Sequence, residues 1–316
     1  MSDETFKIAV AGYGNIGQAI VNQAQKEVND DMKLVGVIRR QVDGEFIEGT
    51  NIPQVSDVGS LSEKPDVVLV AAPSHIAPET TVAYLEKGIA TVDCFDDHSR
   101  REEVRKMYNE AAIPNKTSAV MMSGWDPGID SAVRALVDGL SPEGTTHTKF
   151  GGKKGGKSMG HTTTVKSIEG VKDAVSITKE GTKLNKHVRE VYVVPEKNAD
   201  VDEIARQIMK HPYFKNDDTT VYFVSKTCIS TRDFNKVAKT THHEGHIFNS
   251  GVDVEVDFRL SGKNPVMTAN FMIASARAAA RAVDAGIYGA RTIPEIAPVD
   301  FVKGRTIAER LDKIRC

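Results

Sequence analysis

The stretch FKIAVAGYGNIG, residues 6–17, decides how the chain folds. It begins with a short apolar run typical of a buried strand, and Gly12, Gly14 and Gly17 follow at the GxGxxG spacing. The first glycine permits a tight turn, the second lets the backbone approach a pyrophosphate, and the third lets the next helix pack closely on the strand. Because the start of that helix attracts phosphate, the stretch predicts a dinucleotide-binding turn.

The second predicted strand, Leu34 to Ile38, indicates which dinucleotide binds, because it ends in Arg39 and Arg40. An NAD site usually has an acidic residue at this place for the ribose 2′-hydroxyl, whereas arginine accommodates the 2′-phosphate of NADP. Guanidinium groups bind phosphate through paired hydrogen bonds, and a carboxylate would repel it. The pair therefore favours NADP, with two merely exposed surface arginines as the alternative.

Further buried strands are predicted at 66–72, 89–93 and 118–122, separated by helical segments. This alternation is typical of a Rossmann-type, doubly wound parallel sheet. After residue 145 the predicted strands, such as 190–194, 220–226 and 252–260, alternate in polarity and have few helices between them. That pattern predicts an α+β domain with a mostly antiparallel sheet.

An alanine-rich segment, 265–285, predicts a helix that Gly286 stops and that returns to the nucleotide domain. The predicted domains are therefore 1–122, completed by 265–316, for the dinucleotide, and 123–264 for substrate binding and dimerisation.

The composition excludes several classes of protein. The 316 residues are enough for two domains, and the net charge of −2 gives no bias toward nucleic acid or anionic membranes. The sequence has no apolar run near the roughly 20 residues that span a bilayer, and its polar start, MSDETFK, lacks the layout of a signal peptide. Three scattered cysteines form neither a disulfide framework nor a metal motif. We expect a cytoplasmic protein without nucleic-acid or membrane partners.

Two other motifs are weaker. The segment GGKKGGKS, 151–158, matches the phosphate-loop pattern GxxxxGK[ST], but such a loop needs a following helix, and the threonines at 162–164 are poor helix formers. It is read as a flexible, basic, glycine-rich loop. The segment THHEGH contains His242, His243 and His246 without the spacing of HExxH. We expect loop histidines or one substrate-contacting histidine, and no metal.

Several motifs together resemble the meso-diaminopimelate dehydrogenases over most of the chain. They are AGYGNIG with the arginine pair, TVDCFDDH at 91–98, SGWDPGIDS at 123–131, SMGH at 158–161, GVKDAV at 170–175, HEGH at 243–246 and KNPVMTA at 263–269. The combination of GWDPG with TVDxxDxH is specific. The resemblance implies a homodimer that uses NADP+ to deaminate the D centre of meso-2,6-diaminopimelate, giving L-2-amino-6-oxopimelate, ammonia and NADPH for lysine and cell-wall precursor metabolism.

The resemblance also implies two sets of contacts. Those with the cofactor lie in the glycine turn, the arginine pair and two loops that follow strands: Gly12, Tyr13, Gly14, Asn15, Ile16, Gly17, Arg39, Arg40, Ala72, Pro73, Ser74, His75, Phe95, Asp96 and Asp97. Those with the amino acid substrate are Asp93, Trp125, Asp126, Phe150, Met159, Gly160, Thr178, Arg189, His246 and Asn264.

The chemistry suits these residue types. Hydride can leave the α-carbon only when the attached nitrogen is neutral, so a group or a water must accept a proton from the substrate ammonium. Asp93 and Asp126 are the candidate catalytic residues, because carboxylates can hold that ammonium. Arg189 would pair with a substrate carboxylate, and Trp125 and Phe150 would exclude water. The sequence leaves the proton acceptor open.

Each of these residues has a simpler alternative. The aromatic residues could belong to a core, Asp126 could cap a helix, and Arg189 could form a surface pair with Glu190. Met159 and Thr163 also differ from the glutamine and aspartate of many family members, and the 151–158 loop is three residues longer. A dehydrogenase of another D-amino or diamino acid, or an NADPH-binding regulator without turnover, are the alternative functions.

Overall fold

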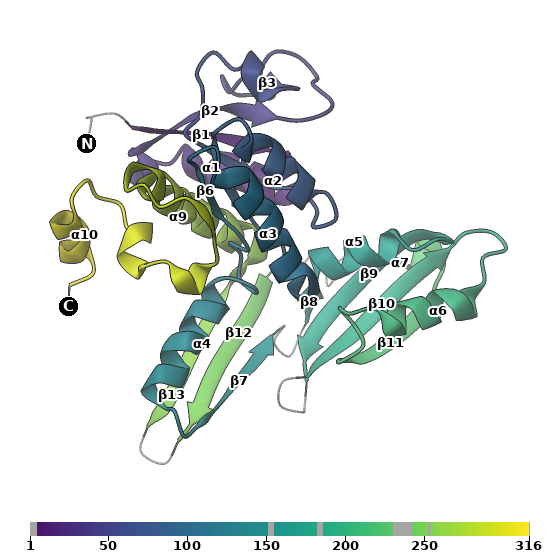
Figure 1. Cartoon of the computed structure of the whole chain (residues 1–316). Coiled ribbons are helices and arrows are strands. Elements are labelled where there is room, and N and C mark those ends of the chain that lie inside the picture. Colours follow the sequence, from purple (N-terminus) through teal and green to yellow (C-terminus); the bar gives the residue numbers. More distant parts are fainter. Residues whose placement is uncertain (1–4, 151–154, 182–185, 230–241, 252–253, 316) are drawn as a thin grey trace. The chain divides into compact units, whose positions relative to one another are not determined.

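The computed structural model of the chain describes residues 5–150, 155–181, 186–229, 242–251 and 254–315. The chain forms two compact units, one of residues 1–132 and 265–316 and the other of residues 133–264 (Figure 1). Helix α4 (Ile129–Leu140) begins in the first unit and ends in the second.

A seven-stranded sheet forms the centre of the first unit. Its strands, in spatial order, are β14 (Gly289–Arg291), β6 (Ser118–Val120), β5 (Ala90–Asp93), β4 (Val67–Val70), β1 (Phe6–Ala11), β2 (Met32–Ile38) and β3 (Gln54–Val55). Every neighbouring pair is parallel. The strand order reverses between β1 and β4, and ligands of such sheets bind at that crevice. The predicted doubly wound sheet is therefore confirmed.

Helices cover both faces of this sheet because its strands are apolar on both sides. The helices of the unit are α1 (Asn15–Ala24), α2 (Ala77–Leu85), α3 (Arg101–Ala112), α9 (Asn264–Asp284) and α10 (Ile307–Lys313). Along β1, Ile8 and Val10 pack in the cluster that contains α1 and α9, whereas Ala9 and Ala11 pack in the cluster that contains Tyr84 of α2. Successive side chains of a strand point to opposite faces, so one short run serves both layers.

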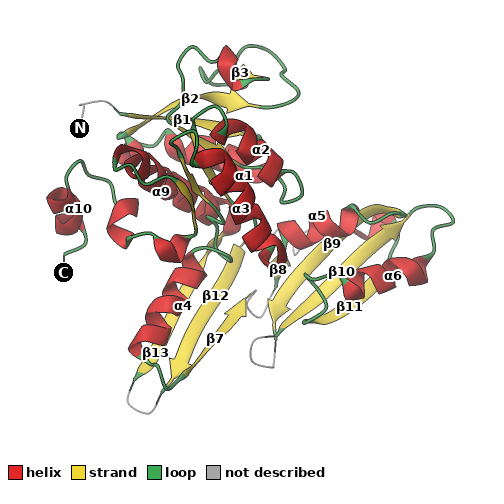
Figure 2. Ribbon diagram, viewed as in Figure 1, coloured by secondary structure: helices red, strands yellow, loops and turns green. Residues whose placement is uncertain are grey.

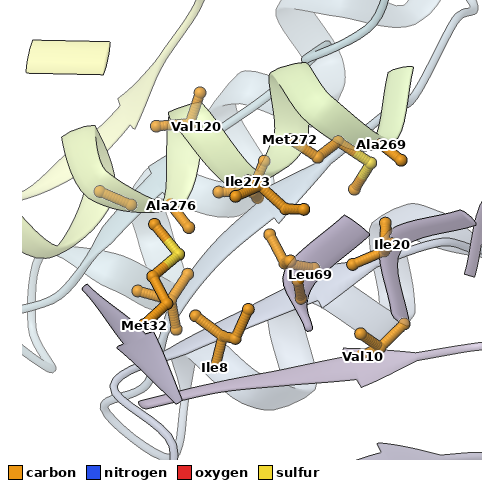
Figure 3. Close-up of a cluster of buried hydrophobic side chains, with 14 of the residues drawn as sticks. Ile8, Val10, Ile20, Met32, Leu69, Val120, Ala269, Met272, Ile273 and Ala276 are labelled. Carbon is orange, nitrogen blue, oxygen red and sulfur yellow. The ribbon is translucent and has the colours of Figure 1, made fainter. Parts of the chain in front are cut away.

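The alanine-rich helix α9 packs on the sheet as predicted. Figure 3 shows Ala269, Met272, Ile273 and Ala276 of α9 gathered with side chains of the strands, among them Leu69. Small residues let the helix approach the strands closely, and Met272 and Ile273 fill the remaining space. The helix is followed by Gly286, whose φ of +70° is in the left-handed region.

Buried arginines tie α9 to neighbouring segments of the same unit. The guanidinium of Arg277 donates to both oxygens of Asp31 at 2.7 Å and to Asn29 at 2.9 Å. Arg281 donates to the backbone carbonyls of Asp300, Val302 and Gly304. Paired, hydrogen-bonded arginines can be buried at little cost.

The second unit contains two sheets. One has the order β11 (Asp218–Phe223), β10 (His187–Pro195), β9 (Val171–Glu180) and β8 (Gly156–Lys157); the other has the order β13 (Glu255–Lys263), β12 (His242–Ser250) and β7 (Thr145–Phe150). Its remaining helices are α5 (Met159–Lys166), α6 (Val201–Lys210) and α7 (Lys226–Ile229). Most neighbouring strands are antiparallel, as expected (Figure 2). Residues 252 and 253 of one predicted strand lie outside the described ranges.

One strand pair departs from the antiparallel pattern, and one expectation for this unit is wrong. Strand β11 pairs with β10 in parallel, because α6 connects them as a crossover helix. The threonines at 162–164 lie in helix α5, which Thr162 and Val165 anchor: the Thr162 hydroxyl accepts a hydrogen bond from the Ser176 N–H at 3.0 Å, and Val165 is fully buried. Tertiary packing overrides weak helix propensity here.

The packing of α9 gives a stability prediction. Ile273→Ala removes a fully buried side chain and should lower the free energy of unfolding of the first unit by about 3 kcal/mol. Unfolding of this unit in urea can be followed by the fluorescence of Trp125, the single tryptophan. The control Val28→Ala, at a side chain 67% exposed, should change stability by less than about 0.5 kcal/mol. Equal effects would contradict the proposed anchoring by α9.

Candidate active site

A cavity of about 910 Å³ lies in the first unit, at the carboxyl ends of β1, β2 and β4. Its lining residues are Ala11, Gly12, Tyr13, Gly14, Ile38, Arg39, Arg40, Gln41, Ser56, Ala71, Ala72, Pro73, Ile76, Thr80 and Tyr84. The glycine turn, the arginine pair and the start of the loop after β4 therefore meet, as the sequence predicted. Some lining residues were not predicted, because a two-residue strand such as β3 and one side of α2 give no recognisable pattern. They include Gln41, Ser56, Ile76, Thr80 and Tyr84.

The three glycines have the geometry that a bound pyrophosphate needs. Gly12 has φ +97°, and a Cβ there would lie 2.6 Å from the Ala71 carbonyl oxygen. A Cβ on Gly17 would overlap the Gly12 carbonyl oxygen, whereas one on Gly14 would meet nothing within 4 Å. Gly14 is also the N-cap of α1 and provides no side-chain cap. The turn thus leaves open space at the positive end of a helix, which suits phosphate.

The two arginines have different surroundings. Arg39 donates to Asp43 at 3.1 Å and to Gln54 at 3.3 Å, and its guanidinium lies 5.8 Å from the centre of the Tyr13 ring. Arg40 is exposed and forms no ion pair within the part of the chain that the structure describes. Arg39 is therefore held against the cavity wall, and the charge of Arg40 is available to a ligand.

The other predicted cofactor residues form a second group. Ser74, after β4, donates to the carboxylate of Asp96, after β5, and the Asp96 N–H donates back to Ser74 at 3.1 Å. Asp97 accepts from the Ser99 N–H at 3.0 Å and caps the short helix η3 (His98–Arg100). Phe95 is fully buried in a core cluster, so any contact with a cofactor would use its backbone. None of these residues, nor His75, lines the cavity.

Asp93, at the end of β5, is buried and fully engaged with protein donors. Its Oδ1 accepts from the Phe95 N–H at 3.0 Å and the Met122 N–H at 2.9 Å, and its Oδ2 accepts from the Tyr108 hydroxyl at 2.6 Å. Burial raises the pKa of Asp93, and the three donors oppose that rise. The carboxylate therefore joins the loop after β5 to the residues after β6, and only Asp126 of the two candidate catalytic aspartates lies near the surface.

The loop that carries Asp126 is shaped by the glycines of GWDPG. Gly128 has φ +140°, and a Cβ there would lie 2.7 Å from the Gly124 nitrogen. Trp125 is buried, at 8% exposed, while the Asp126 carboxylate lies 3.5 Å from Nε2 of His98. The hydrogen bond that His98 donates to this carboxylate is the main cause that raises the pKa of His98. The loop thus presents a carboxylate beside a titratable imidazole.

In the second unit, Arg189 and Thr178 face each other across the β9–β10 pair. The Arg189 Nε donates to Asp217 Oδ2 at 2.7 Å, and its Nη1 donates to the Thr178 hydroxyl. Asp217 also accepts from the His187 N–H at 3.1 Å. Hydrogen bonding from His187 and the charge of Arg189 outweigh burial and hold the pKa of Asp217 well below its usual range. Two of the five N–H donors of the guanidinium are thus fixed, which orients the others.

Neighbouring residues complete this region. Glu190 pairs with Lys179 at 2.6 Å, so the alternative pairing of Arg189 with Glu190 is not formed. His161, which was not predicted, has its Nδ1 2.7 Å from the Ser158 hydroxyl and its Nε2 3.1 Å from the Tyr213 carbonyl. Burial lowers the pKa of His161 well below its ordinary value, so this imidazole is neutral near pH 7.

The remaining predicted substrate residues are distributed along the second unit. Met159 and Gly160 begin α5, His246 lies on β12 with Nε2 3.1 Å from Asp257 Oδ2, and Asn264 is the first residue of α9. The side chains of Phe150, Met159, His242 and His243 lie outside the described residues.

The two weaker motifs are not supported as ligand sites. In the phosphate-loop match, residues 151–154 are not described, but Gly156 and Lys157 pair with β9 as strand β8 instead of cradling a ligand. Within the described ranges, no group of three or more histidine, cysteine, aspartate or glutamate side chains could hold a metal ion. Nor is any described helix long and apolar enough to cross a bilayer.

Comparison with known proteins identifies the family. Residues 124–260 match the model of the diaminopimelic acid dehydrogenase C-terminal domain, and residues 6–94 match that of the oxidoreductase family with an NAD-binding Rossmann fold. The meso-diaminopimelate D-dehydrogenase of Bacteroides fragilis is 31% identical over 94% of this chain and 95% of its own. The chain belongs to the meso-diaminopimelate D-dehydrogenase family. The resemblance inferred from the motifs is thereby confirmed.

Solved structures agree with this family assignment. Diaminopimelate dehydrogenase of C. glutamicum in complex with DAP has a TM-score of 0.82 and 28% identity, over 98% of this chain and 99% of that one. An engineered D-amino acid dehydrogenase bound to NADP+ has a TM-score of 0.81 and 27% identity over the same shares. The likeness therefore covers both units.

The Asp217 interaction gives a pH-dependent prediction. Because the pKa of Asp217 is lower in the folded state, its stabilising effect is present above about pH 4 and is lost as the pH falls further. Asp217→Asn should cost about 3 kcal/mol at pH 7 by leaving the Arg189 charge without its partner. The difference from the natural protein should shrink between pH 5 and pH 3 in urea denaturation followed by circular dichroism.

The matched control is Asp218→Asn, at the exposed neighbouring position, which should change stability little at either pH. An Asp217→Asn deficit that stays constant down to pH 3 would contradict the argument.

Proposed function

We propose that this protein is an NADP-dependent amino acid dehydrogenase that oxidatively deaminates meso-2,6-diaminopimelate at its D centre. The products are L-2-amino-6-oxopimelate, ammonia and NADPH. The observation that carries the proposal is the family relation over 94% of the chain. This stretch includes both the dinucleotide cavity of the first unit and, in the second unit, Arg189 with its partner Asp217.

The residues around the cavity fit NADP. The open turn at Gly14 and the start of α1 would hold the pyrophosphate, and Arg40, beside the wall formed by Arg39 and Tyr13, would pair with the 2′-phosphate. When bound, the nicotinamide accepts the hydride that leaves the substrate α-carbon. A dinucleotide without the 2′-phosphate gains nothing from a second arginine, so the pair selects the phosphorylated form.

The protein residues would bind the substrate and take its proton. Arg189, fixed by Asp217 and Thr178, would bind a carboxylate through its remaining donors. Asp126 would hold the ammonium of the D centre and accept one proton, because the nitrogen must become neutral before hydride can leave. Water then adds to the resulting imine and releases ammonia.

Two further features belong to this proposal. The protein would act as a homodimer, for which the exposed Leu136 and Leu140 of α4 offer apolar surface, and it would work in the cytoplasm. The second candidate function is dehydrogenation of another D-amino acid. It is favoured by Met159 and Thr163 on α5 and by the structural likeness to an engineered D-amino acid dehydrogenase.

The deciding experiment supplies purified protein with NADP+ and, separately, meso-, LL- and DD-diaminopimelate at mildly alkaline pH, where free amine is present. Absorbance in the NADPH band should rise with the meso isomer and not with the LL isomer, because only the former has a D centre. If the absorbance rises with none of the three isomers although fluorescence shows that NADPH binds, the proposal is contradicted. Activity on another amino acid or a regulatory role would then remain.

Cofactor choice can be tested separately. The double variant Arg39→Ala with Arg40→Ala should raise the KM for NADP+ about tenfold or more, since each charged hydrogen bond contributes about 1.5–3 kcal/mol. The KM for NAD+ should change much less. Lys116→Ala, at an exposed position elsewhere in the first unit, is the control for loss of positive charge. Equal increases for both dinucleotides would show that the arginines do not recognise the 2′-phosphate.

A further inference from the structure

We propose that His98 positions Asp126 and relays its proton to solvent during deamination. The inference rests on the proposed function, because it assigns a role within that reaction. It starts from the approach of the two side chains, with His98 Nε2 3.5 Å from Asp126 Oδ1.

The backbone places the two side chains on neighbouring loops. Strands β5 and β6 are parallel neighbours, with Val92 opposite Val120, so the loops after them emerge at the same edge of the sheet. His98 begins η3 on the first of these loops, and Asp126 lies on the second. Two loops that leave the same sheet edge can hold their side chains at a fixed separation.

The buried Asp93 carboxylate locks the two loops to each other. One of its oxygens accepts from Phe95, three residues before His98, and from Met122, four residues before Asp126. Tyr108 of α3 holds the other oxygen at 2.6 Å. The distance between the imidazole and the carboxylate is therefore set by a shared buried anchor instead of by two independent surface chains.

The electrostatic surroundings of His98 are acidic. The charged groups that act on it are Asp126, Asp130 and Asp96. The hydrogen bond that His98 donates to Asp126 and the charges of these carboxylates together outweigh burial and raise the pKa of His98 above 6.5. When the neutral imidazole accepts a proton, the resulting imidazolium is stabilised by the same carboxylates.

The proton balance of the relay is simple. The substrate ammonium gives one proton to Asp126, which becomes a carboxylic acid, and the neutral amine remains. Asp126 then gives that proton to Nε2 of His98, and the imidazolium releases its Nδ1 proton to water, since the His98 side chain is 57% exposed. The separation of 3.5 Å is at the long end of hydrogen-bond distances, and such distances commonly tighten when substrate binds.

The relay predicts how a His98→Asn variant behaves. Its kcat with meso-diaminopimelate should fall about tenfold to a hundredfold, at the lower end of general acid–base effects, while the KM for NADP+ stays within about twofold. The shape of the pH profile of kcat should also change, because the ionisation of His98 no longer contributes. In His98→Gly, added imidazole should restore part of the rate, which a purely structural role would not allow.

Matched variants make the result decisive. Lys106→Gln breaks the exposed ion pair with Glu110, 3.8 Å long, on α3 and should leave kcat and the pH profile unchanged. His98→Gln replaces His98→Asn if the latter does not fold. An unchanged kcat and pH profile in the His98 variants, or a loss that imidazole does not restore and that leaves the profile unaltered in shape, would overturn the relay.

A titration distinguishes failure of this inference from failure of the proposed function. Proton NMR of the His98 Cε1–H, assigned with His98→Asn, should give a midpoint that falls in Asp126→Asn because the main stabilising carboxylate is removed. An unchanged midpoint would overturn the pairing even in an enzyme active on meso-diaminopimelate. If the midpoint falls in Asp126→Asn but the natural protein deaminates none of the three isomers, the proposed function is overturned, and with it the relay.

Discussion

The structure around the candidate active site depends on one buried carboxylate, Asp93. A carboxyl group that is 1% exposed would be costly to bury without partners, and here three donors from separate parts of the first unit satisfy it. The same hydrogen bonds that make burial tolerable also fix the loops that follow β5 and β6. The positions of His98 and Asp126 at the surface are thus a consequence of how a buried carboxyl group is accommodated below them.

The dinucleotide cavity depends on a steric constraint instead of a charge. Gly12 and Gly17 lie where a Cβ would meet backbone carbonyl oxygens, whereas Gly14 faces open space. Gly17 therefore lets helix α1 approach the turn after β1, and Gly12 lets that turn approach the segment after β4. Gly14 keeps room for a ligand. The chain places its charge outside this turn, on Arg39 and Arg40 at the end of the next strand. The two features that suit phosphate, a free helix terminus and the arginine side chains, therefore lie on different segments.

The fold is predictable from the sequence where the determining interactions are local. Strand β1 and helix α9 follow from an apolar run and an alanine-rich stretch, and both ends of each are marked by glycine or by a change in composition. Prediction failed where a distant partner decides, as at Thr162, which the Ser176 N–H helps to hold in a helix. The same limit applies to the site. The family resemblance pointed to Arg189, yet Asp217, which orients it, is 28 residues away in the sequence, and no spacing rule connects the two.

In the second unit, too, some residues fix the position of another: Asp217 and Thr178 orient Arg189. A buried guanidinium needs a counter-charge, and Asp217 supplies one through Nε while Thr178 takes Nη1. If all five donors were satisfied within the protein, Arg189 would be structural alone; if none were fixed, a flexible cation would discriminate poorly between planar carboxylates and other anions. Fixing only part of the fork leaves a charged, oriented surface for a second carboxylate.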